Sequence, residues 1–305
     1  MMRGVIARYG MLLMNERKAY HGPVFSEGGN HWWYAGLADG NYANDDLEQL
    51  PIFPDFHLLK IHPLEIDAGN RGKEHAYLAY TLAYGNIGIL SEGLDAVRRY
   101  AMLQPVQDEY VMRKVRSIEY ADENGTLLNS SQAAIKKLFT KPRLKVVYET
   151  GLEIFVNFSE QNWKLDADSG TITLPQYGFY VRKPRSDLVS SSVLSAQSGK
   201  RLDMVKSKDL YYVNTHGAKI FGDLAGKGEY ILKKEKFGWE IIPLADDSEI
   251  DIDMSLLSIT GKNISFEQLD ADGKRIGSVD NTSGSRIILS PEKQVEKYRI
   301  IPKVD

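Results

Sequence analysis

The segment densest in polar and aromatic side chains spans residues 22–44, GPVFSEGGNHWWYAGLADGNYAN. Glu27 follows a short apolar run that predicts a buried strand, and two glycines and an asparagine separate it from His31, Trp32 and Trp33. A carboxylate at the C-terminal end of a barrel strand is typical of a catalytic group. Apolar neighbours would raise its pKa and suit it to act as a general acid, while the indole faces could stack on a sugar ring. The alternative is that Glu27 caps a helix or forms an ion pair and that both tryptophans belong to the core.

A second cluster lies in residues 60–67, KIHPLEID. His62, at the end of a predicted strand, together with Glu65 and Asp67 could bind substrate hydroxyl groups through charge-assisted hydrogen bonds. A metal site built with another histidine is an alternative, but no HExxH or comparable ligand spacing is present. A third interpretation is a strand-end histidine bonded to backbone, with solvated acids beside it. We therefore expect substrate-binding residues here, with no metal and no cofactor.

Other suggestive motifs fail on their spacing. The segment that begins Asp270-Ala271-Asp272-Gly273 resembles a calcium loop, but Arg275 stands where that loop needs glycine. It is better explained as a hairpin turn. The segment 222–228, GDLAGKG, has the wrong glycine spacing for a phosphate-binding loop, and no Gly-x-Ser-x-Gly elbow occurs.

Composition narrows the classes of function. The 305 residues include 38 basic and 41 acidic side chains, a formal net charge of −3, which gives no electrostatic argument for binding nucleic acid or an anionic membrane. No cysteine is present, which excludes disulfides and thiolate chemistry. No apolar stretch approaches the length of a membrane span, and the first residues do not form a signal peptide. The localisation stays open.

The elements that would position these groups change in character near residue 105. Before it, helices are predicted at 4–15, 74–84 and 92–103, with short strands at 22–29 and 57–62 and an apolar run at 86–90. Strands that alternate with helices indicate parallel βα units.

After residue 105 the pattern is one of short strands separated by turn signals, which is typical of β-sandwiches. We expect the following domains: 1–105, part of a (β/α) barrel; 106–185, a β-sandwich; 186–205, a linker or long loop; and 206–305, a second small β-sandwich. The predicted fold class is therefore α/β plus all-β.

Five segments carry a resemblance to a known group of enzymes: GPVFSEGGNHWWYAGLADGNY, PDFHLLKIHPLEIDAGN, AYLAYTLAYGNIGIL, LKVVYETGLEIFVNFSEQNWKL and LPQYGFYVR. Over residues 1 to about 185 the chain resembles the C-terminal portion of a bacterial TIM-barrel glycoside hydrolase, in which late barrel strands precede β-sandwich domains. The resemblance implies cleavage of a glycosidic bond by two carboxylates, with Glu27 as general acid/base and carbohydrate as the partner.

The chain also departs from that pattern, because a complete barrel takes about 250 residues and only about 100 precede the β-rich region. Three barrel strands are expected, ending near Glu27, His62 and Leu90. We therefore expect a C-terminal fragment that does not turn over a glycoside by itself, since the second carboxylate would come from an earlier strand. An open parallel barrel edge would favour self-association.

The competing hypothesis is a non-catalytic carbohydrate-binding or interaction protein built on the sandwiches. In that case Trp163 and Trp239 would be exposed platforms. The alternation of Trp163 with polar neighbours, on the face that it shares with Leu165, instead predicts a core residue.

Overall fold

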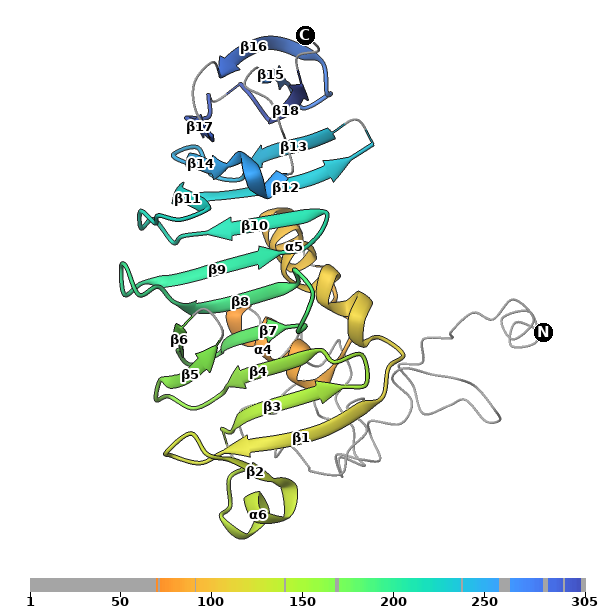
Figure 1. Cartoon of the computed structure of the whole chain (residues 1–305), viewed down its shortest axis with the longest axis vertical. Helices are drawn as coiled ribbons and strands as arrows, with labels where there is room; N and C mark the ends of the chain where they lie inside the picture. Colours follow the sequence, from red (N-terminus) through yellow and green to blue (C-terminus); the bar gives the residue numbers. More distant parts are fainter. Residues whose placement is uncertain are drawn as a thin grey trace, which may run out of the picture. The chain divides into compact units, whose positions relative to one another are not determined.

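The computed structural model describes residues 70, 72–90, 92–139, 141–167, 170–236, 238–257, 264–281, 285–292 and 294–302. Of these residues 45% lie in strands and 18% in helices, and the sheets are antiparallel (Figure 1). The predicted α/β class is wrong for this part of the chain, which contains no (β/α) barrel. The apolar run 86–90, predicted as the third barrel strand, has no regular secondary structure, and the first two predicted strands lie outside the described residues.

The described chain separates into two compact units. The first contains the described residues up to Leu103, Gln107–Trp163 and Pro175–Phe179, and the second contains Gln104–Val106, Lys164–Leu174 and the residues from Tyr180 onward. No described helix is both long enough and apolar enough to span a membrane.

The first unit begins with two helices, α4 (Glu74–Tyr84) and α5 (Gly93–Tyr110). Helix α4 has the bounds that the sequence predicts, and Gly85 ends it in a left-handed conformation in which the Gly85 and Asn86 amides bond back to the last turn. Helix α5 runs seven residues beyond the predicted end at 103 and keeps Pro105 inside it.

The strands of the first unit form an antiparallel sheet in the order β2-β1-β3-β4. They are β1 (Val115–Ala121), β2 (Leu127–Asn129), β3 (Arg143–Tyr148) and β4 (Glu153–Asn157), with the short helix α6 (Ser130–Ile135) between β2 and β3. Helix α6 starts with a capping box in which Asn129 and Gln132 bond reciprocally.

Alternation along these strands separates an apolar face from a charged one. Tyr120, Leu144, Val146 and Ile154 are buried on one face. Helix α4 packs against β4, and the rings of Tyr80 on α4 and Phe158 lie 4.6 Å apart (Figure 1). Among the described residues, helices and not a second sheet cover this face. Period-two alternation in a sequence shows that one face of a strand is buried, but it does not show what buries that face. The β-sandwich predicted at 106–185 is therefore corrected to a sheet that helices cover.

The second unit contains a longer antiparallel sheet in the order β8-β9-β10-β12-β13-β18-β15-β16. Its strands are β8 (Val189–Leu194), β9 (Arg201–Lys206), β10 (Leu210–Asn214), β12 (Glu229–Glu235), β13 (Gly238–Pro243), β15 (Ile264–Leu269), β16 (Arg275–Asn281) and β18 (Lys297–Pro302). Three short strands precede β8 along the chain: β5 (Trp163–Ala167), β6 (Gly170–Leu174) and β7 (Gly178–Arg182).

A three-stranded sheet covers one face of this long sheet. It consists of β11 (Leu224–Lys227), β14 (Glu249–Asp253) and β17 (Arg286–Leu289) in the order β11-β14-β17, and a 3₁₀ turn (Met254–Leu257) follows β14. The buried core between the two layers includes Trp239, Ile241 and Phe266 from the long sheet and Ile250 and Ile287 from the short one.

Residues 186–205, predicted as a linker or long loop, instead form β8, a turn and most of β9. Ser190, Ser191 and Ser192 lie in β8 and are at most 4% exposed. Serine is not a typical strand former, so the composition of this segment indicated a loop. Pairing of β8 with β9 over six residues outweighs that local preference.

Candidate functional site

The residues that the sequence singled out for chemistry lie outside the described part of the chain. They are the predicted catalytic Glu27 and the predicted substrate-binding His31, Trp32, Trp33, His62, Glu65 and Asp67. Their catalytic and substrate-binding roles stay predictions.

The two tryptophans of the competing hypothesis are described, and both are buried. Trp163 is 2% exposed and packs near Phe155, with ring centroids 6.1 Å apart, while Trp239 is 6% exposed and belongs to the core of the second unit. The prediction that Trp163 is a core residue is confirmed. The expectation that Trp163 and Trp239 form exposed platforms is wrong, because the apolar faces of their strands are covered.

A row of polar side chains crosses four strands on the face of the long sheet opposite the apolar core. The register places Ser192 on β8 beside Asp203 on β9, Asp203 beside Asn214 on β10, and Asn214 beside Glu229 on β12. Directly opposed residues point to the same face, so the four side chains form one line. All four residues are less than 9% exposed. Buried polar groups require partners, so this row requires a hydrogen-bond network.

The partners of the row come from the same strands and the turn after β10. Tyr212 donates to Glu229 over 2.8 Å, and Arg201 donates to Ser192 over 2.8 Å. Burial, with Glu229 and Asp203 nearby, holds the pKa of Tyr212 well above its ordinary value, so the hydroxyl stays a donor. Burial also lowers the pKa of Arg201, an effect that Asp203 opposes.

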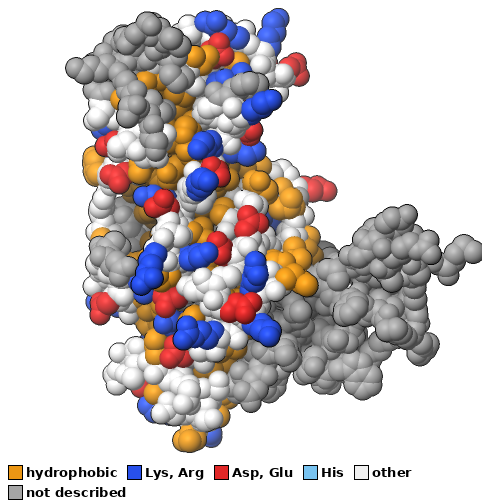
Figure 2. Space-filling view, turned by 45° about the vertical axis from the view of Figure 1, so that its right-hand side comes forward, with side chains coloured by type: hydrophobic (Ala, Val, Ile, Leu, Met, Phe, Trp, Pro, Cys, Tyr) orange, Lys and Arg blue, Asp and Glu red, His pale blue; other side chains and the backbone are white. Residues whose placement is uncertain are grey.

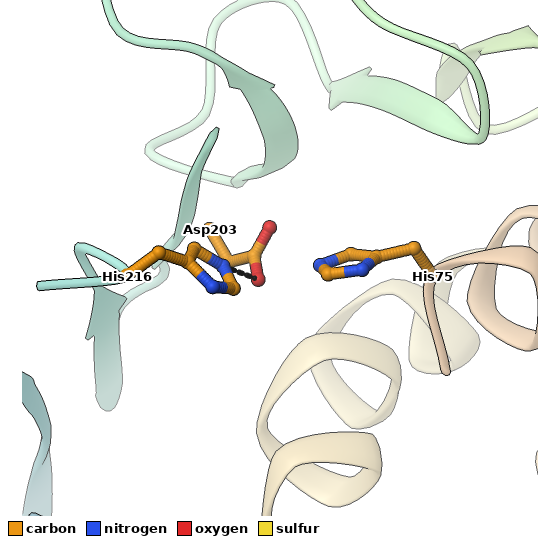
Figure 3. Close-up of side chains that lie close together, drawn as sticks. All are labelled: His75, Asp203 and His216. Atoms are coloured by element: carbon orange, nitrogen blue, oxygen red, sulfur yellow. Dashed lines mark hydrogen bonds and ion pairs between the residues drawn. The ribbon is translucent and has the colours of Figure 1, made fainter. Parts of the chain in front are cut away.

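His216 contacts the two middle residues of the row, Asp203 and Asn214. Its Nε2 lies 2.8 Å from the Asp203 Oδ2, and the dashed line in Figure 3 marks this contact. Its backbone amide donates to Asn214. The His216 side chain is 32% exposed and that of Asp203 is 7% exposed, so the buried carboxylate orients a solvent-accessible imidazole. His75, also drawn in Figure 3, belongs to α4 of the first unit.

A charged row follows on the same face, farther along the sheet. Lys233 on β12 pairs with Glu240 on β13, Glu240 with Arg299 on β18, and Arg299 with Glu267 on β15. The signs alternate across four strands. Glu240 is the centre of this row, because its Oε1 accepts from Arg299 over 2.8 Å and its Oε2 accepts from Lys297 over 3.0 Å.

The charged row opens onto a shallow depression of about 360 Å³. It is lined by Glu235, Lys236, Gly238, Glu240, Lys297 and Arg299. Burial by itself raises the pKa of Glu240, but hydrogen bonds and charge from Arg299 and Lys297 outweigh it and lower the pKa below the ordinary value. Glu240 is therefore an ionised acceptor, 9% exposed, held in one geometry by two cations.

Sequence reasoning did not find these residues, although a signal was present. Asp203 and Glu240 each stand between apolar residues in strands of alternating pattern, a position that places a charge on the face opposite the core. What the strand pattern could not supply was the register that aligns them with partners on other strands.

The comparisons with known proteins assign neither a family nor a function to the chain. No protein-family model matches the chain, no curated protein matches its sequence, and no solved structure matches its fold. The resemblance to glycoside hydrolases therefore rests on the quoted segments alone.

Proposed function

We propose that the chain binds a carbohydrate, and that the depression around Glu240 on the second unit is the binding site. The observation that carries the proposal is an ionised carboxylate whose two oxygens are fixed by Arg299 and Lys297 at the floor of an open, charged depression. The ring stacking expected at Trp163 and Trp239 plays no part, since both side chains are buried.

The lining suits a neutral ligand with many hydroxyl groups. A hydroxyl group needs both a donor and an acceptor, and the lining offers carboxylate acceptors beside ammonium and guanidinium donors. Glu240 takes up one donor of Lys297 and two of Arg299, whereas an ammonium carries three and a guanidinium five. Donors of both cations are therefore left for bound hydroxyl groups.

Gly238 contributes backbone to the same lining. Its φ is 130°, a conformation that side-chain-bearing residues rarely adopt, and a Cβ there would lie 3.2 Å from the Ile300 carbonyl oxygen. The absence of a side chain leaves the end of the β12–β13 hairpin open beside Glu240. Hydrolysis of the ligand through Glu27 is a separate prediction, which concerns a residue outside the described part.

The test is a screen of the purified 305-residue chain against a panel of oligo- and polysaccharides, followed by calorimetric titration of any ligand found. Lys297→Met removes one wall of the depression and should weaken binding by roughly tenfold or more, as loss of a hydrogen bond to a charged group does. Lys219→Met is the matched control, because Lys219 also pairs with a glutamate, Glu249, at 2.9 Å, but outside the depression.

The control variant should bind as the parent does. Failure of the parent to bind any glycan, or equal binding by the two variants, would contradict the proposal. Thermal unfolding of each variant shows that a loss of binding is not a loss of fold.

A further inference from the structure

The hairpin turn between β1 and β2 holds the one Asn-Gly pair of the sequence, Asn124-Gly125 (Figure 1). Asn124 is exposed and Gly125 is half-buried. In such a pair the glycine nitrogen can close a five-membered ring onto the asparagine side chain, and glycine has no Cβ to obstruct the approach. Reacting groups that neighbour each other in one chain need no enzyme to bring them together. The turn therefore contains a candidate site of spontaneous modification.

The reaction at such a pair is a deamidation in two steps. The Gly125 nitrogen gives up its proton to water and bonds to Cγ of Asn124, while the side-chain amide takes up a proton and leaves as ammonia, so that a cyclic imide remains. Water then adds to one of the two imide carbonyl carbons and breaks the bond from that carbon to nitrogen. Opening at Cγ gives aspartate, and opening at the main-chain carbonyl gives isoaspartate, whose backbone runs through Cβ and Cγ. Both steps need only water, and either product makes the formal net charge one unit more negative than −3.

The hairpin turn between β15 and β16 shows that the aspartate product fits the turn. It has Asp272-Gly273 where the first turn has Asn124-Gly125. In both turns the glycine amide donates over 2.9 Å to the carbonyl oxygen three residues earlier, and the glycine φ is 83° in the first turn and 76° in the second. Aspartate in place of Asn124 is therefore compatible with the same backbone, whereas isoaspartate adds an atom to the main chain and is not.

Asp122 closes the first turn through its side chain. Its Oδ1 accepts from the Asn124 and Thr126 amides, both over 3.0 Å. Asp270 makes the corresponding two bonds in the second turn. A hydrogen bond from Lys136 to the Asp122 Oδ2, 3.1 Å long, lowers the pKa of Asp122 and keeps it an ionised acceptor. The side chain of Asp122 thus holds the backbone on both sides of Gly125.

The closed turn opposes the reaction. The Gly125 N–H donates to the Asp122 carbonyl oxygen over 2.9 Å, so this bond must break before the nitrogen can attack. The peptide between Asn124 and Gly125 must also rotate to bring the nitrogen onto Cγ. Arg143 on β3, 9% exposed, restrains the same segment by donating to the Asp122 and Glu123 carbonyl oxygens, each over 3.3 Å. Opening of the turn therefore precedes the chemical step.

We propose that Asn124 is a site of spontaneous deamidation and that Asp122 controls its rate by keeping the turn closed. Asn129, which is also exposed and precedes Ser130, is a poorer site, because its Oδ1 accepts from the Gln132 amide over 3.0 Å as the cap of α6. The added carboxylate joins a surface of mixed charge, as the interspersed basic and acidic side chains in Figure 2 illustrate. The inference concerns the first unit and does not depend on carbohydrate binding.

Incubation of the folded full chain at mildly alkaline pH, which favours loss of the amide proton, tests the site when peptide mass spectrometry follows the products over time. Asn124 should convert to aspartate and isoaspartate faster than any other asparagine. Asn129 in the same samples is the internal control. No conversion at Asn124, or conversion no faster than at Asn129, would overturn the proposal.

Substitution of the two turn aspartates tests the control of the rate. Asp122→Ala removes both Oδ1 bonds and should raise the conversion rate of Asn124 several-fold, whereas Asp122→Asn keeps an oxygen acceptor and should stay near the parent rate. Asp270→Ala is the matched control, because it removes the corresponding bonds of the other turn and should leave the rate unchanged. Thermal unfolding shows that each variant is folded, and the parent tests the site even where a variant is not. Equal rates in the parent and Asp122→Ala, or an Asp122→Asn or Asp270→Ala variant as fast as Asp122→Ala, would overturn the role of Asp122.

Discussion

The two units bury one face of a β-sheet by different means. In the first unit helices α4 and α5 supply the cover, and the interface is rich in tyrosine, as in the Tyr110–Tyr148 pair at 5.6 Å. In the second unit a three-stranded sheet supplies the cover, and most of the interface is aliphatic. The choice of cover decides which polar groups become trapped between the layers.

Three large aromatic residues in the core of the second unit donate from their polar tips to backbone carbonyl oxygens. Tyr211 donates to the Leu256 carbonyl oxygen, Tyr230 to that of Ala225 and Trp239 to that of Leu257. In the first unit, the Tyr148 hydroxyl and the Trp163 Nε1 are buried and have no hydrogen-bond partner among the described atoms. Tyr211, Tyr230 and Trp239 thus tie the two layers of the second unit together, whereas Trp163 contributes by packing alone.

Alanine in place of either tryptophan should destabilise its unit by a similar amount, whereas phenylalanine should destabilise the two units by different amounts. Trp163→Ala and Trp239→Ala should each cost about 3–5 kcal/mol, since both remove a large buried aromatic. The phenylalanine variants should differ. Trp239→Phe leaves the Leu257 carbonyl unpaired, whereas Trp163→Phe removes a donor that is already unpaired, so Trp163→Phe should be the less costly by about 1–3 kcal/mol.

Urea denaturation of the four variants, followed by circular dichroism, provides the measurement. Equal losses for the two phenylalanine variants would show that the unpaired Trp163 donor carries no cost.

Gly226 lies at a closely packed point of the three-stranded sheet in the second unit. A Cβ on Gly226 of β11 would lie 1.8 Å from the Glu249 carbonyl oxygen on β14, and its φ is 114°. Gly226→Ala must therefore separate two paired strands and adopt a strained backbone, at a cost of about 3 kcal/mol. Gly199, with φ 67° and open space around it, is the control, and Gly199→Ala should cost only about 1 kcal/mol. Thermal unfolding of both variants tests this, and equal losses would exclude a tight β11–β14 contact.

The charged faces of the two units should differ least, in the cost of removing one glutamate charge at neutral pH and in how that cost responds to acid. Glu240 has a pKa lowered from its ordinary value of 4.5, so its ion pairs add stability above that pH, and the contribution is lost as pH falls through the lower, folded-state pKa. Glu240→Gln should cost about 1–2 kcal/mol at neutral pH, and this difference should shrink once the pH drops below 4.5.

The matching residue in the first unit is Glu119, 33% exposed and 3.9 Å from Lys145. Glu119→Gln should change the free energy of unfolding by less than about 1 kcal/mol at neutral pH. Denaturant titrations at several pH values give both comparisons. A Glu240→Gln difference that persists undiminished below pH 4 would contradict the assigned ionisation.

Local elements of both units follow from sequence pattern. The helix at 74–84 was predictable residue by residue from its apolar run and the glycine that ends it. Strands such as 178–182 and 210–214 have the predicted bounds, and the predicted turn at Asp270–Gly273 joins β15 to β16, with Asp270 accepting from the Asp272 and Lys274 amides. Alternation, turn residues and caps act over a few residues, so they leave a signature in the sequence.

Prediction failed where distant segments decide the outcome. Ser190–Ser192 form a buried strand because β9 pairs with them, and α5 continues past Pro105 because the residues beyond it, such as Tyr110, pack in the core. The prediction of the fold class failed for the same reason. Short strands with regular turns are compatible both with a sheet covered by helices and with a sheet covered by a second sheet.

By itself, then, the sequence determined the strand periodicity, the turns and the position of helix α4, because these depend on neighbours along the chain. Only the tertiary structure decided that helices cover one sheet and a small sheet covers the other, and that Glu240 meets Arg299 and Lys297, which lie 59 and 57 residues away. Register between strands depends on the packing of whole faces, so a charge in a strand reveals its side but not its partners.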